Sequence, residues 1–250
     1  MIFIKDIWKS FGKKEVLRGL SLQVPVGETL VVMGRSGCGK SLLLKMIAGL
    51  LRPDRGEIFY DGQGLNNLHW KDMNRIRNKI GFLFQSAALF DFMTVSENVG
   101  FMLSQHAKMS RLEIEKVVAE KLSLVDLSGT ELLKPAELSG GMRKRVGLAR
   151  AIASDPDLIL YDEPTTGLDP ITCVEINNLI NDLHETLEVT SIVVTHDIDS
   201  AFSVATRMAM IHQGRTIIDG TPDEIMDSTD PNVHEFVSQA SVTNRYDVMV

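Results

Sequence analysis

The sequence predicts an α/β protein in which a buried sheet is interrupted by a helical insertion. Three observations support this class: short apolar runs, longer stretches with apolar residues at helical spacing, and a glycine-rich segment between a strand and a helix. Apolar runs that do not alternate with polar residues are typical of parallel strands covered on both faces. The 250 residues, of which 44% are hydrophobic, suffice for one large domain or two small lobes.

The elements are expected in a definite order along the chain. Periodicity of two and runs of branched residues predict strands at 2–5, 21–24, 29–33, 56–60, 81–84, 158–161 and 191–194. A hairpin is expected from residues 208–212 and 215–219. Helical spacing dominates between residues 95 and 153, and further helices are expected at 42–51, 171–187 and 222–237.

The glycine-rich segment matches the phosphate-binding pattern G-x-x-x-x-G-K-S, known as Walker A. Its residues are Gly34, Arg35, Ser36, Gly37, Cys38, Gly39, Lys40 and Ser41. Glycines let the backbone N–H groups converge on a phosphate, and the N-terminus of the following helix favours the same anion. Lys40 suits the β- and γ-phosphates of a nucleoside triphosphate, and the Ser41 hydroxyl suits Mg²⁺. An accidental glycine turn is the alternative, which the flanking strand and helix disfavour.

Two carboxylates follow the strand expected at 158–161. Open α/β sheets bind their ligands at the carboxyl ends of strands, where Asp162 and Glu163 are placed by this pattern. Asp162 is suited to Mg²⁺, directly or through water, and Glu163 is suited to polarise an attacking water. Read alone, the pair could equally be ordinary surface acids; the upstream phosphate loop favours the catalytic interpretation.

Composition limits the partners and the location. The net charge of −7 disfavours a nucleic-acid-binding surface, and no nucleic-acid partner is expected. No apolar run reaches the roughly 18 residues that span a bilayer, and the first residues do not resemble a signal peptide. A cytosolic protein is therefore expected, with any membrane role exerted through a partner. Cys38 and Cys173 are too few for a disulfide framework.

The run Leu138-Ser139-Gly140-Gly141, placed between the phosphate loop and the acidic strand end, resembles the signature of the ATP-binding-cassette ATPases. Other motifs of that family follow the same order: Gln85 resembles the glutamine loop, Asp169 the D-loop, and His196 the switch histidine. Phe11 resembles the aromatic residue that stacks on adenine. The resemblance implies an ABC-type P-loop fold over residues 2–237, with an N-terminal antiparallel β subdomain and a helical subdomain at about 87–155.

The resemblance also implies a role for each residue. Gln85 would bind Mg²⁺ or the attacking water, and His196 would hydrogen-bond the γ-phosphate; with Glu163 they form the expected catalytic set. Ser139, Gly140 and Gly141 would complete the ATP site of a second subunit, with Asp169 near the seam, so an ATP-dependent homodimer is expected. Structural alternatives exist for each: a core aromatic for Phe11, turn residues for Gln85 and His196, and an ordinary helix N-cap for Ser139.

One departure from the family pattern points to a subfamily. The usual glutamine after L-S-G-G is Met142, followed by basic residues 143–145; this resembles the MlaF-like ATPases of the Mla/Mce-type phospholipid transporters. The resemblance implies an ATP-hydrolysing motor at the cytoplasmic face of the inner membrane that drives phospholipid transport and maintains outer-membrane lipid asymmetry. Implied partners are an MlaE-like permease, an MlaB-like STAS-domain regulator and an MlaD-like Mce protein. The basic run has a second interpretation, a solvated helix face.

Two more segments are assigned through this resemblance. Residues 87–93 are too apolar for a free loop, and they are expected either to pack in the core or to line the groove that receives a coupling helix of the permease. The tail at 238–250 either contacts the neighbouring subunit or is disordered. Alternatives for the whole chain are another ABC importer or exporter, a soluble ABC ATPase acting on ribosomes or DNA, and a P-loop kinase or GTPase.

Overall fold

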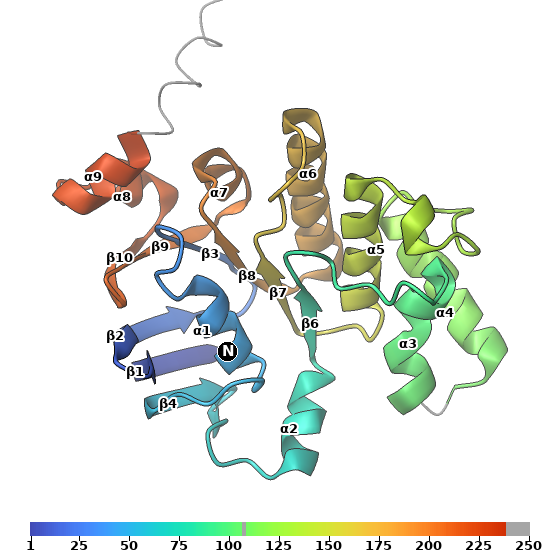
Figure 1. Ribbon diagram of the computed structural model, residues 1–250, viewed down its shortest axis with the longest axis horizontal. Helices are drawn as coiled ribbons and strands as arrows, with labels where there is room; N and C mark the ends of the chain where they lie inside the picture. Colours follow the sequence, from blue (N-terminus) through green and yellow to red (C-terminus); the bar gives the residue numbers. More distant parts are fainter. Residues whose placement is uncertain (107–108, 239–250) are drawn as a thin grey trace, which may run out of the picture. The chain divides into compact units, whose positions relative to one another are not determined.

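The computed structural model describes residues 1–106 and 109–238, and it divides into two compact units (Figure 1). The first unit combines Met1–His69 with the chain from Ile192 onward, and the second comprises Trp70–Ser191. The tail expected at 238–250 lies outside the described residues except for Ser238.

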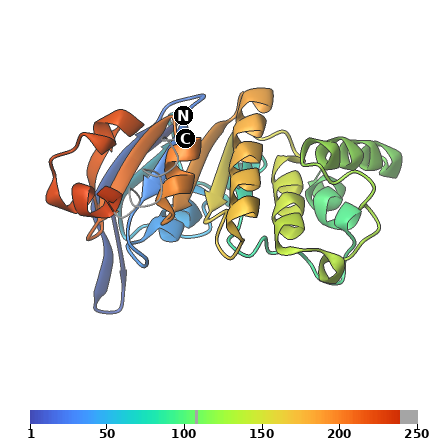
Figure 2. The same cartoon turned by 90° about the horizontal axis from the view of Figure 1, so that it is seen from above.

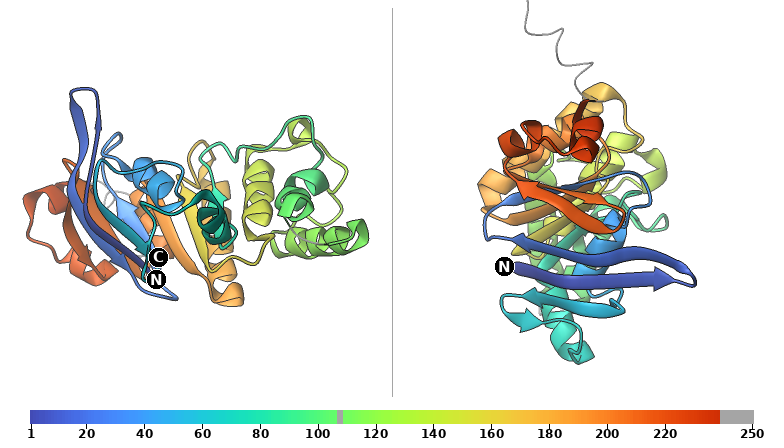
Figure 3. Two further views of the ribbon diagram at one scale, coloured as in Figure 1. Left: turned by 90° about the horizontal axis from the view of Figure 1, so that it is seen from below. Right: turned by 90° about the vertical axis from the view of Figure 1, so that its left-hand side faces the viewer.

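An antiparallel sheet opens the first unit, which confirms the predicted N-terminal antiparallel subdomain. Its strands are in the order β2-β1-β4-β5, with β1 at Ile2–Phe11, β2 at Lys14–Val24, β4 at Arg55–Tyr60 and β5 at Gln63–Gly64. Along the second half of β2, buried apolar and exposed polar residues alternate, as expected for a sheet with one covered face. Figure 3 shows the long strands β1 and β2 running side by side to the turn after Phe11.

The phosphate-loop strand lies in a second set of strands in this unit. β3 (Thr29–Met33) is buried at all five positions and pairs in parallel with β9 (Arg207–His212), which forms the predicted hairpin with β10 (Arg215–Gly220). The helices of this unit are α1 (Lys40–Ile47), α7 (Ile198–Val204), α8 (Pro222–Met226) and α9 (Pro231–Ser238). The single helix expected at 222–237 was wrong: the chain breaks at residues 227–230, where Asp230 accepts hydrogen bonds from the N–H groups of Asn232 and Val233 and caps α9.

The second unit pairs two parallel strands with a group of helices. β6 (Ile80–Leu83) runs parallel to β7 (Leu158–Asp162), which is wholly buried. Figure 2 shows α3, α4 and α5 gathered together within this unit, in the stretch where helical periodicity was recognised. The helices are α2 (Trp70–Arg77), α3 (Val95–His106), α4 (Arg111–Leu124), the 3-10 turn η1 (Pro135–Glu137), α5 (Gly140–Ile152) and α6 (Pro170–Leu187); β8 (Thr190–Thr195) begins here and ends in the first unit.

Across residues 1–106 and 109–238, none of the helices combines the length and the apolar character that a bilayer crossing requires.

Candidate functional site

The phosphate loop connects β3 to α1, and its two end glycines are sterically required. Gly34 has φ +150°, and a Cβ there would lie 2.5 Å from the Ile211 carbonyl oxygen. Gly39 has φ +108°, and a Cβ there would lie 2.6 Å from a methyl carbon of Leu17. A larger residue at Gly34 would overlap main chain, and one at Gly39 would overlap the Leu17 side chain and adopt a strained backbone conformation. The predicted glycine pattern is therefore explained by packing as well as by backbone conformation.

The helix that follows the loop is arranged to receive an anion. Gly39 is the N-cap of α1 and has no side chain with which to cap it. The Lys40 side chain is buried, and its ammonium donates to the Gly34 carbonyl at 2.7 Å, so the cation lies across the loop. Arg35 is exposed and pairs with Glu235 of α9 at 2.5 Å. The two basic residues of the loop thus differ: Lys40 is held against the loop backbone, whereas Arg35 lies at the surface.

Phe11 and His196 also lie in the first unit. Phe11 is the last residue of β1 and is 54% exposed, with the Lys9 ammonium 5.7 Å from its ring centroid. His196 is exposed and directly follows β8, whose final residues belong to this unit beside β3. Asp197 fixes the backbone after it by capping α7, accepting from the N–H groups of residues 199 and 200. Both predicted side chains are therefore accessible and stand at the ends of ordered strands.

In the second unit, the acidic pair stands at the end of β7 as predicted. Asp162 is 5% exposed and Glu163 is 7% exposed, so both carboxylates are buried. Glu163 has φ +50°, a left-handed conformation that is rare for a residue with a side chain and concentrates at functional sites. The Thr166 hydroxyl donates to the Glu163 carboxylate at 3.3 Å. The strand end thus presents a buried, hydrogen-bonded carboxylate on a strained backbone rather than an ordinary surface acid.

The signature and D-loop motifs lie against each other in this unit. Ser139 is the N-cap of α5 and accepts from the N–H of Met142 at 3.2 Å. Asp169 is the N-cap of α6, where the Thr172 hydroxyl donates to it at 2.6 Å and the Thr172 N–H at 3.0 Å. Hydrogen bonding by this hydroxyl, then by the N–H, lowers the pKa of Asp169. A Cβ on Gly141 would lie 2.7 Å from a Thr172 methyl, so the two helix starts are in close contact.

Gln85 is exposed two residues beyond the end of β6, and α5 holds its loop. The Lys144 ammonium donates to the backbone carbonyl of Gln85 at 2.5 Å and to that of Glu163 at 3.0 Å. Burial lowers the pKa of Lys144 to about 8, although the charges of Asp162 and Glu163 oppose the shift. Arg150 donates to the carbonyls of residues 87 and 88, at 2.5 and 2.7 Å.

The basic run after the signature is therefore not a solvated helix face. Arg143 is exposed, but Lys144 is buried and Arg145 is half-buried, donating to the Val125 carbonyl and to the carboxylates of Asp126 and Glu175. Sequence reasoning missed Lys144 and Arg150 as supports of the glutamine loop. Nothing in the helical spacing of α5 identifies their carbonyl partners, which lie 19 to 63 positions away along the chain.

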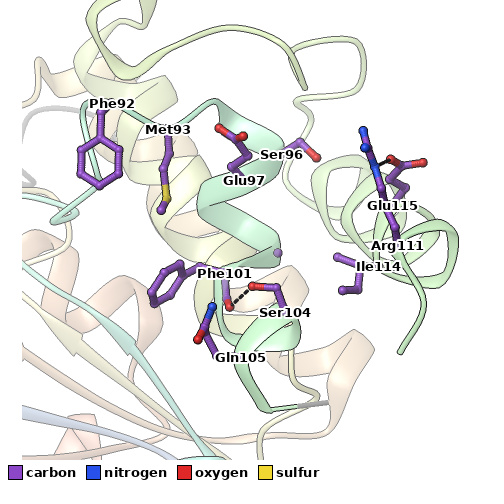
Figure 4. A pocket seen from close by; sticks show the side chains of 11 residues that line it. Phe92, Met93, Ser96, Glu97, Phe101, Ser104, Gln105, Arg111, Ile114 and Glu115 are labelled. Carbon is purple, nitrogen blue, oxygen red and sulfur yellow. Dashed lines mark hydrogen bonds and ion pairs between the residues drawn. The ribbon is translucent and has the colours of Figure 1, made fainter. Parts of the chain in front are cut away.

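A pocket of about 670 Å³ opens among the helices of the second unit (Figure 4). Figure 4 shows Phe92, Met93 and Phe101 on one side and the α4 residues Arg111, Ile114 and Glu115 on the other. Of the apolar segment expected at 87–93, only Phe92 and Met93 line this pocket. Ala87 is buried, Phe90 packs on Phe101 at 4.8 Å between ring centroids, and Phe92 is 75% exposed.

A buried asparagine fixes this wall. Asn98 is fully buried, and its amide donates to the carbonyls of residues 90, 93 and 94 while its oxygen accepts from the Phe90 N–H at 2.8 Å. Its two N–H donors are shared among three carbonyls and its oxygen accepts once, so these hydrogen bonds of the side chain all go to one loop. Sequence reasoning did not identify Asn98, because an asparagine within an amphipathic helix usually faces solvent.

The order of motifs, the fold and the local geometry define an ATP-binding-cassette ATPase. The family described as ABC transporter matches residues 17–166, which is more than half of the chain. The chain belongs to this family and is an ATP hydrolase that binds nucleotide.

Several ABC proteins with named functions or solved structures are similar to this chain over most of its length. The intermembrane phospholipid transport system ATP-binding protein MlaF of Haemophilus influenzae is 42% identical over 96% of this chain and 91% of its own length. The probable ribonucleotide transport ATP-binding protein mkl of Mycobacterium leprae is 41% identical, over 95% of this chain and 68% of its own length. A solved dimeric ATP-binding cassette in a post-hydrolysis state with ADP and Pi matches with a TM-score of 0.81 at 35% identity, covering 88% of this chain and 98% of that one.

Proposed function

We propose that this chain is the motor subunit of a transporter that moves phospholipid between membranes, with ATP hydrolysis as its energy source. The observation that carries the proposal is the 42% identity to an MlaF protein over 91% of that protein's length. The L-S-G-G-M signature, with methionine in place of the usual glutamine, agrees with this assignment. The competing candidate is ribonucleotide transport, which the name of the mycobacterial relative indicates.

The site residues act on ATP in separate roles. The N–H groups of residues 34–39, the Lys40 ammonium and the start of α1 bind the phosphates, and Phe11 stacks on adenine. Glu163 polarises the attacking water as general base, and His196 hydrogen-bonds the γ-phosphate and orients the water. The restrained, buried carboxylate of Glu163 supports this role, because a general base must be held within hydrogen-bond reach of the water.

Mg²⁺ fits the donors that the chain offers. The Ser41 hydroxyl, the Asp162 carboxylate and the Gln85 amide oxygen are the hard oxygen ligands that this ion takes, and they would hold it. Within residues 1–106 and 109–238 no group of three or more His, Cys, Asp or Glu forms a metal cage. Mg²⁺ needs none, since it is usually bound through one or two protein oxygens together with phosphates and water. When bound, it neutralises the developing charge on the β- and γ-phosphates.

Two copies of the chain form the working unit. Ser139, Gly140 and Gly141 of one copy bind the γ-phosphate held by the other copy, with Asp169 at the seam. Hydrolysis removes the γ-phosphate contacts, and the population shifts to the open dimer. The close contact between Gly141 and Thr172 supports this role, because it places two helix N-termini together on one surface.

The pocket in Figure 4 receives a helix of the permease. Phe92, Met93 and Ile114 offer an apolar floor, while the carboxylates of Glu97 and Glu115 supply polar contacts. This combination suits an amphipathic helix laid into a groove. The chain is then peripheral at the cytoplasmic face of the inner membrane, with MlaE-like, MlaB-like and MlaD-like partners.

The proposal is tested by purifying the Glu163→Gln protein with ATP from membranes and identifying the co-purified proteins and lipids by mass spectrometry. Lys40→Ala, which should not hold ATP, is the control for nucleotide dependence. We expect a permease, an Mce protein and a STAS-domain protein, with phospholipid bound to the complex. A complex that carries ribonucleotide and no phospholipid would transfer the assignment to the competing cargo.

The groove is tested separately. Phe92→Ser should abolish co-purification with the permease and leave ATP binding unchanged. Leu132→Ser is the matched control, because Leu132 is 86% exposed in the same unit but does not line the pocket. Equal co-purification of both variants would refute the docking assignment.

A further inference from the structure

Two loops that carry proposed catalytic groups share an unusual backbone. Glu163 has φ +50°, and residues 87 and 88, just after Gln85, have φ +60° and +48°. A left-handed residue with a side chain is strained and persists only where its surroundings fix it. The surroundings here are two cations of α5: Lys144 binds the Glu163 carbonyl, and Arg150 binds the carbonyls of residues 87 and 88.

Lys144 is the more informative of the two cations, because it reaches both loops. Its side chain is 5% exposed, and its ammonium donates to the carbonyls of Gln85 at 2.5 Å and Glu163 at 3.0 Å. A buried lysine is normally retained only when its charge and its donors are used. The Lys144 ammonium donates to the main-chain oxygens of Gln85 and Glu163, the two residues that are proposed to contact the attacking water.

We propose that Lys144 is a positioning residue for ATP hydrolysis: from the signature helix it fixes the backbones of Gln85 and Glu163 at once, and so sets where both side chains meet the water. The inference rests on the proposed role of Glu163. It predicts a defect in turnover rather than in ATP binding, because Lys144 donates to the carbonyls of Gln85 and Glu163 and not to the phosphate loop.

The test compares Lys144→Met, Lys144→Gln and Lys121→Met in the full-length protein. Methionine keeps the length of the side chain without its donors, and glutamine restores neutral N–H donors. Lys121 is the matched control, because it is 4% exposed in the same unit but binds Glu120 and Asp155. We expect kcat to fall at least about tenfold in Lys144→Met, with Kd for ATP within about twofold of the wild type. Lys144→Gln should recover at least about threefold of that loss, and Lys121→Met should keep kcat within about twofold.

A mutant cycle then separates positioning from structural damage. If Lys144 acts through Glu163 and Gln85, adding Lys144→Met to a protein that already carries Glu163→Gln and Gln85→Ala should change the residual single-turnover rate less than about twofold. Three results would overturn the inference: a further tenfold loss of rate in the combined variant, a parallel loss of ATP affinity, or a normal kcat in Lys144→Met. If Lys144→Met does not fold, Lys144→Gln takes its place in the same cycle. Normal turnover in Glu163→Gln would overturn the catalytic assignment and this inference with it, whereas normal turnover confined to Lys144→Met overturns the inference alone.

Discussion

Ser139→Ala separates the structural and functional roles of the signature serine. Ser139 caps α5 by accepting from the Met142 N–H at 3.2 Å. Replacing an N-cap serine by alanine costs about 1 kcal/mol, which for a chain of this length lowers Tm by about 2–4 °C. A residue that only caps a helix should show this loss of stability and nothing more.

The proposed contact with the γ-phosphate of the second copy adds a larger effect. A hydrogen bond to a charged group contributes about 1.5–3 kcal/mol, and each 1.4 kcal/mol is about tenfold in affinity. Because a symmetric dimer loses this bond at both composite sites, we expect the ATP-bound dimer of Ser139→Ala to dissociate about a hundred- to ten-thousandfold more readily. The measurement is sedimentation equilibrium with ATP in the Glu163→Gln background, where the nucleotide is not consumed.

The chain supplies a matched control in Ser110. Ser110 caps α4 through a reciprocal pair of bonds with Glu113, at 2.6 and 3.4 Å, and like Ser139 it is exposed at the start of a helix. Ser110→Ala should lower Tm by the same few degrees while the dimer constant stays unchanged. Equal dimer constants in the two variants would refute the assignment of Ser139 to a composite ATP site.

Three other predictions concern packing, pH and thiol chemistry. In Gly81→Ala the new Cβ would overlap the carbonyl oxygen of Ala151, so thermal unfolding should show a loss of about 1–3 kcal/mol; an unchanged Tm would contradict this packing. The hydrogen bond from Lys9 lowers the pKa of Asp54 below its usual 3.8. The stabilising effect of the Asp54 carboxylate should therefore be complete above pH 3.8 and disappear as the pH falls through the pKa of Asp54 in the folded protein. Urea unfolding of Asp54→Asn and the wild type should differ at about pH 7 and differ less at about pH 3. Alkylation of Cys38, inside the phosphate loop, should abolish ATP binding, and ATP should slow the reaction; equal rates with and without ATP would refute it.

The strands of the sheet could be predicted from sequence because their signal is local. β3 was expected at 29–33 and is observed there, since five consecutive buried residues leave no other periodicity. α2 was not predicted, because only Met73 and Ile76 of its eight residues are buried, and one such pair does not define a helical face. The break between α8 and α9 was signalled by Asp230-Pro231, a cap followed by a first-turn proline, but was overlooked.

The candidate site was predictable as a set of motifs but not as a set of contacts. Glu163 was recognised from its place after a buried strand, yet its left-handed backbone was not, because it follows from tertiary bonds. The burial of Lys144 depends in the same way on carbonyls that lie 59 and 19 positions away. A basic run on a helix carries no information about such partners.

α5 connects the proposed docking pocket with the proposed chemistry. α3, which lines the pocket and carries Asn98, packs on α5, and Arg150 ties the segment after Gln85 to the same helix. Ser139 starts that helix and Lys144 reaches the Glu163 carbonyl from it. Because these groups share one helix of 13 residues, a displacement at the pocket wall that moves α5 would act on the Gln85 loop and on the signature together. Coupling between permease and hydrolysis then requires no separate relay, only that α5 moves as one body.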